Sequence, residues 1–248
     1  MAVPVLQKID LVLDEEQLLH RLIRDFPSNA PSEVAVVEWV EHEINVNRSL
    51  GEDLSPGLHE LMAAIADGVH LIHVSGLGLP GPLPDTPTAK VPPEDARLSA
   101  HDVAHLFVVA HAGVAYGCVH THGGRLTHDV FSMPGALDNS RHSRGGFRFH
   151  VDGAMDPETA PQYFSMQCLR NSERVPTFAS TVDYGDFDAE TWDLLTAPVY
   201  TIHFDGRVPR SSDLTDVPVI DARPDGSIER LHYYDDTERL RVPGGGSD

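Results

Sequence analysis

The spacing of apolar residues changes along the chain, and this change constrains the fold more than any other feature. Three early segments repeat apolar residues at the three- and four-residue intervals of amphipathic helices, namely 10–25, 31–44 and 58–67. From Gly68 onward, short apolar runs alternate with turns rich in Gly and Pro, which is typical of β-strands. The sequence therefore predicts an α+β fold in which a helical part (1–67) flanks a double-stranded β-helix, or jelly-roll, core (68–248).

Individual elements can be expected within the second part. The predicted strands are 68–74, 118–122, 126–131, 163–169, 176–182, 199–204 and 217–220. The predicted helices are 99–117 and 186–195. Between residues 79 and 97, six prolines indicate a long surface connection, because proline cannot donate to a strand ladder. No internal repeat or long linker divides the chain, so one domain over 1–248 is expected.

Charge and composition limit the kinds of molecule that the protein can bind. With 38 acidic against 18 basic residues, the net charge is -20, which would repel nucleic acid and anionic membrane surfaces. A small molecule is the better candidate. No run of eighteen apolar residues and no signal-like N-terminus is found, so a cytoplasmic protein is expected. The two cysteines, Cys118 and Cys168, lie in apolar strand-like segments and are predicted to be buried free thiols.

A His-x-Asp triplet, His150-Val151-Asp152, follows a loop rich in Gly, Ser and Arg. In an extended strand, residues i and i+2 share a face, so both side chains can converge on one metal ion. They would supply two of the three ligands of the facial triad that holds Fe(II) in non-haem oxygenases. With 15 histidines and 38 acidic residues, about two such triplets are expected by chance. The second, His203-Phe204-Asp205, shows that spacing cannot choose between them.

The other histidines favour simpler interpretations. His42 and His59 lie in acidic helical surroundings and are expected to be solvated. His70 and His73 would point to opposite faces of one strand, so they cannot form a metal-binding pair. The group of His120, His122 and His128 is explained by chance in a histidine-rich chain.

Several segments in order resemble one family. They are His122-Gly123-Gly124-Arg125, Phe149-His150-Val151-Asp152, the run from Pro161 to Arg170, and Pro176-Thr177-Phe178-Ala179-Ser180. From about Gly68 to about Asp236, the chain resembles the clavaminate synthase-like Fe(II)/2-oxoglutarate oxygenases, particularly the asparagine and arginine hydroxylases of peptide-antibiotic pathways. The resemblance implies a dioxygenase that uses Fe(II) and 2-oxoglutarate to hydroxylate a free amino acid or a derivative of one.

The resemblance also implies roles for particular residues. His150 and Asp152 would bind iron, and Thr177 would help to hold 2-oxoglutarate. The amino-acid substrate would contact Thr121, His122, Asp235 and Asp236. Relatives carry acidic or amide residues at the position of Thr121, so this departure bears on the substrate. His203 and Asp205 match no ligand motif of the family and are expected to be structural.

The family pattern continues to a distal histidine, the third iron ligand, and to an arginine that pairs with the far carboxylate of 2-oxoglutarate. Neither motif is found before Asp248, so the core is expected to be truncated and the chain to bind Fe(II) weakly. His232 lacks the family context, and Arg125 and Arg170 are possible substitutes for the arginine. The alternative is a truncated, non-catalytic protein of the oxygenase fold. A third option is half of a split enzyme, which a C-terminal chain or a second copy would complete.

Overall fold

The computed structural model describes residues 6–11, 37–39, 41–42, 56–77, 83, 85–88, 98–117, 124–133, 150–151, 161–202, 214–224, 228–231 and 240–241. The chain divides into two compact units. Unit 1 comprises Met1–Phe131 and Ser165–Thr181, and unit 2 comprises Ser132–Phe164 and Val182–Asp248. The expectation of one domain over 1–248 remains a prediction. None of the helices in the described ranges has both the length and the hydropathy that spanning a membrane requires.

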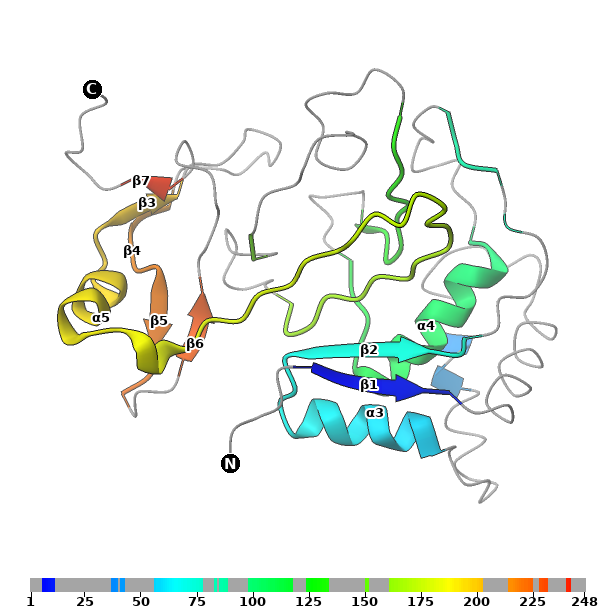
Figure 1. Cartoon of the computed structure of the whole chain (residues 1–248), viewed down its shortest axis with the longest axis horizontal. Coiled ribbons are helices and arrows are strands. Elements are labelled where there is room, and N and C mark those ends of the chain that lie inside the picture. Colours follow the sequence, from blue (N-terminus) through cyan, green and yellow to red (C-terminus); the bar gives the residue numbers. More distant parts are fainter. Residues whose placement is uncertain are drawn as a thin grey trace. The chain divides into compact units, whose positions relative to one another are not determined.

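Unit 1 contains a parallel pair of strands, β1 (Leu6–Asp10) and β2 (Leu71–Ser75), beside helix α3 (Pro56–Ala66) (Figure 1). The register runs from Leu6 opposite Leu71 to Asp10 opposite Ser75. Ile9 is 1% exposed and packs with three residues of α3 and the turn after it, namely Leu61, Ala64 and Val69. Burial of these apolar side chains is what holds the helix on the strands.

The start of unit 1 differs from expectation at two places. A helix was predicted from residue 10, but Asp10 is the last residue of β1 and Leu11 lies in neither a helix nor a strand; residues 12–25 lie outside the described residues. A buried strand was predicted at 68–74, whereas β2 begins at Leu71 and is exposed or half-buried throughout. The strand ends at Ser75, directly before Gly76. Gly76 has φ +81, and a Cβ there would meet the backbone oxygen of Leu11 at 2.8 Å.

Helix α4 (Ala100–Ala112) has a capping interaction at each end. Ser99 is its N-cap, and a capping box joins the Ser99 side chain to the Asp102 backbone and the Asp102 carboxylate to the Ser99 backbone. The helix ends at Gly113, whose N–H donates to the Val109 carbonyl, and not at Gly117 as predicted. Val114 therefore lies outside the helix and is 81% exposed.

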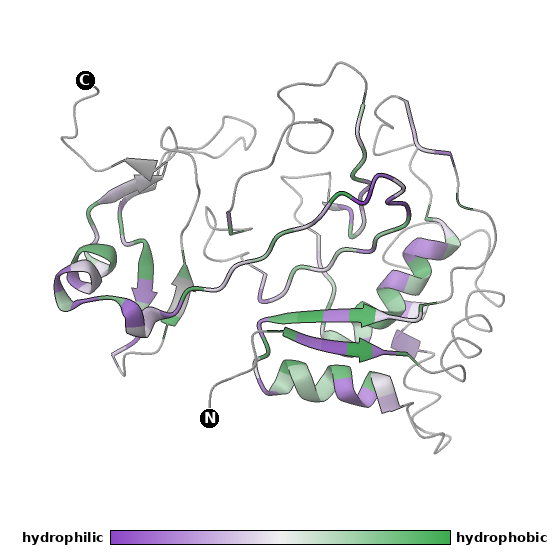
Figure 2. Ribbon diagram, viewed as in Figure 1, coloured by the Kyte–Doolittle hydropathy of each residue, from purple (hydrophilic) through white to green (hydrophobic). Residues whose placement is uncertain are grey.

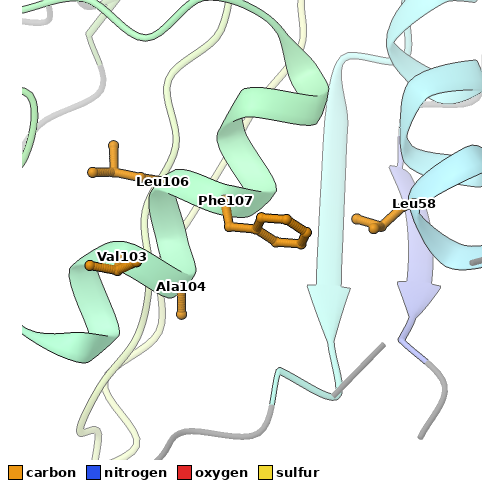
Figure 3. Close-up of a cluster of buried hydrophobic side chains, with 5 residues drawn as sticks. All are labelled: Leu58, Val103, Ala104, Leu106 and Phe107. Atoms are coloured by element: carbon orange, nitrogen blue, oxygen red, sulfur yellow. The ribbon is translucent and has the colours of Figure 1, made fainter. Parts of the chain in front are cut away.

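The larger core of unit 1 joins α3 to α4. Figure 3 shows Phe107 of α4 directed toward Leu58 of α3, with neighbours Val103, Ala104 and Leu106 on α4. All five side chains are at most 5% exposed. The partly buried Val37 and Trp39 pack against this cluster from residues that are helical, as the 31–44 segment was predicted to be.

Three predicted strands are not formed. Residues 126–131, 163–169 and 176–182 are all described, and none of them lies in a helix or strand. Leu126 packs against the α3–α4 core, but Phe164, Met166 and Phe178 are 58%, 62% and 74% exposed. Figure 2 shows apolar residues along this extended part of the chain as well as along α3, so hydropathy alone does not distinguish the two. Within the part of the chain that the structure describes, these segments pair with no neighbouring strand, which a ladder requires.

Unit 2 combines short helices and short strands. The 3-10 helix η3 (Tyr184–Asp186) precedes α5 (Ala189–Thr196), which confirms the helix predicted at 186–195. Asp188 caps α5 by accepting from the Thr191 N–H at 2.7 Å. The aromatic side chains Tyr184, Phe187 and Trp192 meet edge to face and pack against the buried residues Tyr200, Val219 and Ile220.

The strands of unit 2 form two small antiparallel sheets. Strand β3 (Tyr200–Ile202) lies between β4 (Leu214–Val217) and β7 (Leu240–Arg241). Strand β5 (Ile220–Ala222) pairs with β6 (Ile228–Leu231). The prediction of one strand over 217–220 is wrong, because Pro218 separates β4 from β5 and the two belong to different sheets. The predicted strand at 199–204 is confirmed over Tyr200–Ile202.

Candidate functional site

The predicted iron-binding strand is described at two residues. His150 forms a single β-bridge, and both His150 and Val151 are half-buried. An extended backbone at His150 is the geometry that places residues i and i+2 on one face. Asp152 lies outside the described residues, as do His203, Asp205 and His232. Within the described ranges, no three His, Cys, Asp or Glu side chains gather closely enough to hold a metal ion. The assignment of His150 and Asp152 therefore remains a prediction.

Thr177, the predicted 2-oxoglutarate contact, is exposed and lies in the extended segment Ser165–Thr181 of unit 1. Thr121, His122, Asp235 and Asp236, the predicted substrate contacts, lie outside the described residues. Of the two arginines considered for the role of the family arginine, Arg125 is half-buried. Arg170 is exposed and donates to Thr86 Oγ1 at 2.8 Å.

Helix α4 carries three histidines that the sequence patterns did not single out. His101 is 3% exposed, and His111 is 6% exposed, with its Nδ1 donating to the Phe107 carbonyl at 2.8 Å. His105 Nε2 forms a hydrogen bond with Ser165 Oγ at 2.7 Å. The i, i+4 spacing of His101 and His105 places them on one face of the helix, and this spacing is the signal that could have drawn attention to them.

Burial affects the proton affinity of His105. Desolvation lowers its pKa below 6.5, and the negative charge of Asp102 opposes this shift only in part. The neutral imidazole is therefore favoured at neutral pH. A neutral ring carries one donor and one acceptor nitrogen, and either can bond a serine hydroxyl.

The expectation that His42 and His59 are solvated is confirmed, whereas His70 precedes β2 and therefore does not share a strand with His73. His42, His59, His70, His73 and His128 are all exposed. Cys168 is a free thiol, as predicted, but it is exposed rather than buried, and the segment around it forms no strand. Cys118 lies outside the described residues.

Comparisons with known proteins gave matches among solved structures only. The chain matches the crystal structure of the non-haem iron oxygenase OrfP in complex with Fe and alpha-ketoglutaric acid, with a TM-score of 0.69 and 21% identity over 96% of this chain and 74% of OrfP. It matches OrfP in complex with Fe, succinate and (3S)-hydroxy-L-Arg with a TM-score of 0.68 and 19% identity, over 96% and 76%. OrfP in complex with Fe and L-homoarginine gives 0.64 and 20%, over 96% and 75%.

The chain has the fold of OrfP. The match spans 96% of the chain. It also confirms the expected mixture of helices and strands. No protein-family model matches the chain, and a search of curated proteins finds no match either.

Proposed function

We propose that this protein is an Fe(II)- and 2-oxoglutarate-dependent oxygenase that hydroxylates a free amino acid or a derivative of one, with a jelly-roll core and a role in peptide-antibiotic metabolism. The observation that carries the proposal is the shared fold with OrfP, a structure that holds Fe and alpha-ketoglutaric acid, over 96% of the chain. The ordered family motifs around His150 and Thr177 support it independently, because they come from the sequence rather than from the fold.

His150 and Asp152 are the proposed iron ligands. The extended, half-buried backbone at His150 fits this role, since it favours the same-face placement of positions 150 and 152. One imidazole nitrogen and one carboxylate are also the donor types that non-haem iron prefers. When bound, iron supplies the activation of O2 that the side chains of the protein cannot provide.

Thr177 is the proposed contact for 2-oxoglutarate. Its hydroxyl can donate to a carboxylate oxygen, and its exposure on Ser165–Thr181 leaves the hydroxyl accessible to a ligand. The role of the protein in this reaction is to hold the cosubstrate and the amino acid in fixed positions and to exclude water around them.

A cationic amino acid is the proposed substrate class. OrfP has been crystallised with L-homoarginine and with (3S)-hydroxy-L-Arg. The net charge of -20 would attract a cationic amino acid, and carboxylates such as Asp235 and Asp236 can bind a guanidinium through paired hydrogen bonds. Thr121 and His122 would contact the same substrate.

The experiment is an anaerobic Fe(II) titration followed by measurement of succinate in the presence of O2, 2-oxoglutarate and a panel of amino acids that includes L-arginine and L-homoarginine. Succinate formation that depends on one amino acid, and that His150→Ala abolishes while His59→Ala does not, would support the proposal. His59 is the matched control because it is an exposed helical histidine. Absence of iron binding by the wild-type protein would favour the non-catalytic alternative instead.

A further inference from the structure

The extended segment Ser165–Thr181 has little regular structure to hold it in place. It belongs to unit 1, contains no helix or strand, and nearly all of its side chains are exposed. Phe178, the neighbour of Thr177, is 74% exposed. A segment of this kind can present a side chain to a ligand in one position only if specific contacts fix its backbone.

One such contact joins the beginning of the segment to helix α4. His105 Nε2 and Ser165 Oγ are 2.7 Å apart. The helix is a firm support, because its N-terminus has a capping box and its buried face carries Val103 and Phe107 in the unit 1 core. The imidazole of His105 is half-buried, whereas Ser165 is exposed.

Further hydrogen bonds fix the backbone of the segment between Ser165 and Thr177. Arg170 donates to Thr86 Oγ1 at 2.8 Å. The Asn171 side chain then closes a turn, donating to the Val175 carbonyl at 2.8 Å and accepting from the Val175 N–H at 2.7 Å. Arg174 has φ +54 within this turn, which reverses the chain just before Thr177 (Figure 1). The position of Thr177 is therefore linked to Ser165 through a short, internally bonded stretch.

We propose that His105 is a positioning residue, whose hydrogen bond to Ser165 holds the segment Ser165–Thr181 on α4 and so sets the place of Thr177. The inference rests on the proposed function, in which Thr177 contacts 2-oxoglutarate. It adds a residue far from the iron motif in sequence, on a helix that the family motifs do not include. In this proposal His105 acts through its hydrogen bond to Ser165 and not by contact with substrate or metal.

Four variants isolate the hydrogen bond. His105→Leu removes the polar group and keeps an apolar side chain of similar reach, whereas His105→Gln keeps a polar atom near the position of Nε2. Ser165→Ala removes the other partner. Ser180→Ala is the matched control in the same segment, because its hydroxyl makes only a 3.4 Å contact with the adjacent Thr181 carbonyl.

Two measurements are made on the full chain loaded with Fe(II). The first is the KM for 2-oxoglutarate and the kcat, measured as succinate formation. His105→Leu and Ser165→Ala are each expected to raise this KM by about three- to tenfold, the range that loss of one hydrogen bond corresponds to, with a smaller change in kcat. The double variant is expected to be no worse than either single one, since both remove the same interaction. His105→Gln should recover most of the loss, and Ser180→Ala should match the wild type.

The second measurement is amide hydrogen exchange, which does not depend on activity. Faster exchange in residues 165–181 of His105→Leu and Ser165→Ala, with α4 unchanged, is the expected result. Unchanged exchange and unchanged KM in both variants would overturn the inference. If the wild type does not bind 2-oxoglutarate, the proposed function fails, and with it the role of Thr177. Faster exchange would then still establish the link between His105 and Ser165 as a structural one.

Discussion

Helix α4 and the segment Ser165–Thr181 lie in the same unit and both carry large apolar side chains. The helix buries these side chains, whereas the segment exposes them. Phe107 on α4 is 5% exposed, whereas Phe178 on the segment is 74% exposed. A helix satisfies its backbone hydrogen bonds internally, so it can form first and then present one apolar face to a core. An extended chain needs partner strands for its backbone, and without them its side chains have no common face to bury.

The largest effect on stability is expected for a substitution in the buried core that α4 forms with α3. Phe107→Ala should lower the free energy of unfolding by about 3–5 kcal/mol, because it removes a ring from the α3–α4 core and leaves a cavity. Urea unfolding followed by circular dichroism measures this change. A loss below about 1 kcal/mol would mean that the core around Leu58 and Phe107 is not closely packed.

Loss of the N-cap of α4 is expected to have an intermediate effect on stability. Ser99→Ala removes the acceptor for the Asp102 N–H and one half of the capping box, and it should cost about 1 kcal/mol. The control is Ser180→Ala, which removes a hydroxyl from the extended segment and should leave the unfolding midpoint unchanged. Equal effects of the two substitutions would show that α4 does not depend on its cap.

A smaller, pH-dependent effect is expected from His105. Its pKa is lowered in the folded protein by burial, so the unfolded state binds the proton more tightly. The stability that the neutral imidazole provides is complete above the unfolded pKa of about 6.5, and it falls as the pH drops toward the lower folded value. The unfolding midpoint of the wild type should therefore decrease from pH 7.5 to pH 5 more than that of His105→Gln. Identical pH profiles would contradict this assignment.

The smallest effect on stability is expected for a substitution in the exposed segment Ser165–Thr181. Phe178→Ala should change the free energy of unfolding by less than about 0.5 kcal/mol, since an exposed ring contributes little to folding. The same urea measurement applies, with Phe107→Ala as its counterpart. A loss above about 1 kcal/mol would show that this segment is covered in solution, for instance by strand partners such as those the sequence patterns predict.

The helices were predicted from the sequence because their signals are local. The apolar spacing of Val103, Leu106 and Phe107 indicated α4, and the segment 58–67 indicated α3 to within a few residues of its observed bounds. The error at the end of α4 also has a local cause. Gly113 and Gly117 are both possible end points, and the apolar Val114 between them continues the helical spacing in the sequence although its side chain is exposed.

Strands were predicted less well because a strand depends on a partner elsewhere in the chain. Nothing in Leu6–Asp10 alone indicates that it pairs with Leu71–Ser75, and this strand was missed. The β-propensity of 163–169 and 176–182 suggested two strands, but propensity mainly reflects packing against neighbouring strands, and among the described residues these segments pair with none. The family resemblance, and with it the expected fold, came instead from motifs that occur in order along the chain. For the site, the His150 triplet could be found by spacing, whereas the role of His105 depends on a contact with a residue 60 positions away.

The parallel pairing of β1 with β2 has a consequence for the order in which unit 1 assembles. Leu6 and Leu71 can meet only after the intervening chain, including α3, has been arranged across the pair. Closing so long a loop is entropically costly, and contacts of high sequence separation slow folding. Helices α3 and α4 are therefore expected to dock before β1 adds to β2. During unfolding, β1 is expected to separate from β2 first. Its separation would uncover Ile9 and the apolar face of α3, while the rest of the unit 1 core remains intact.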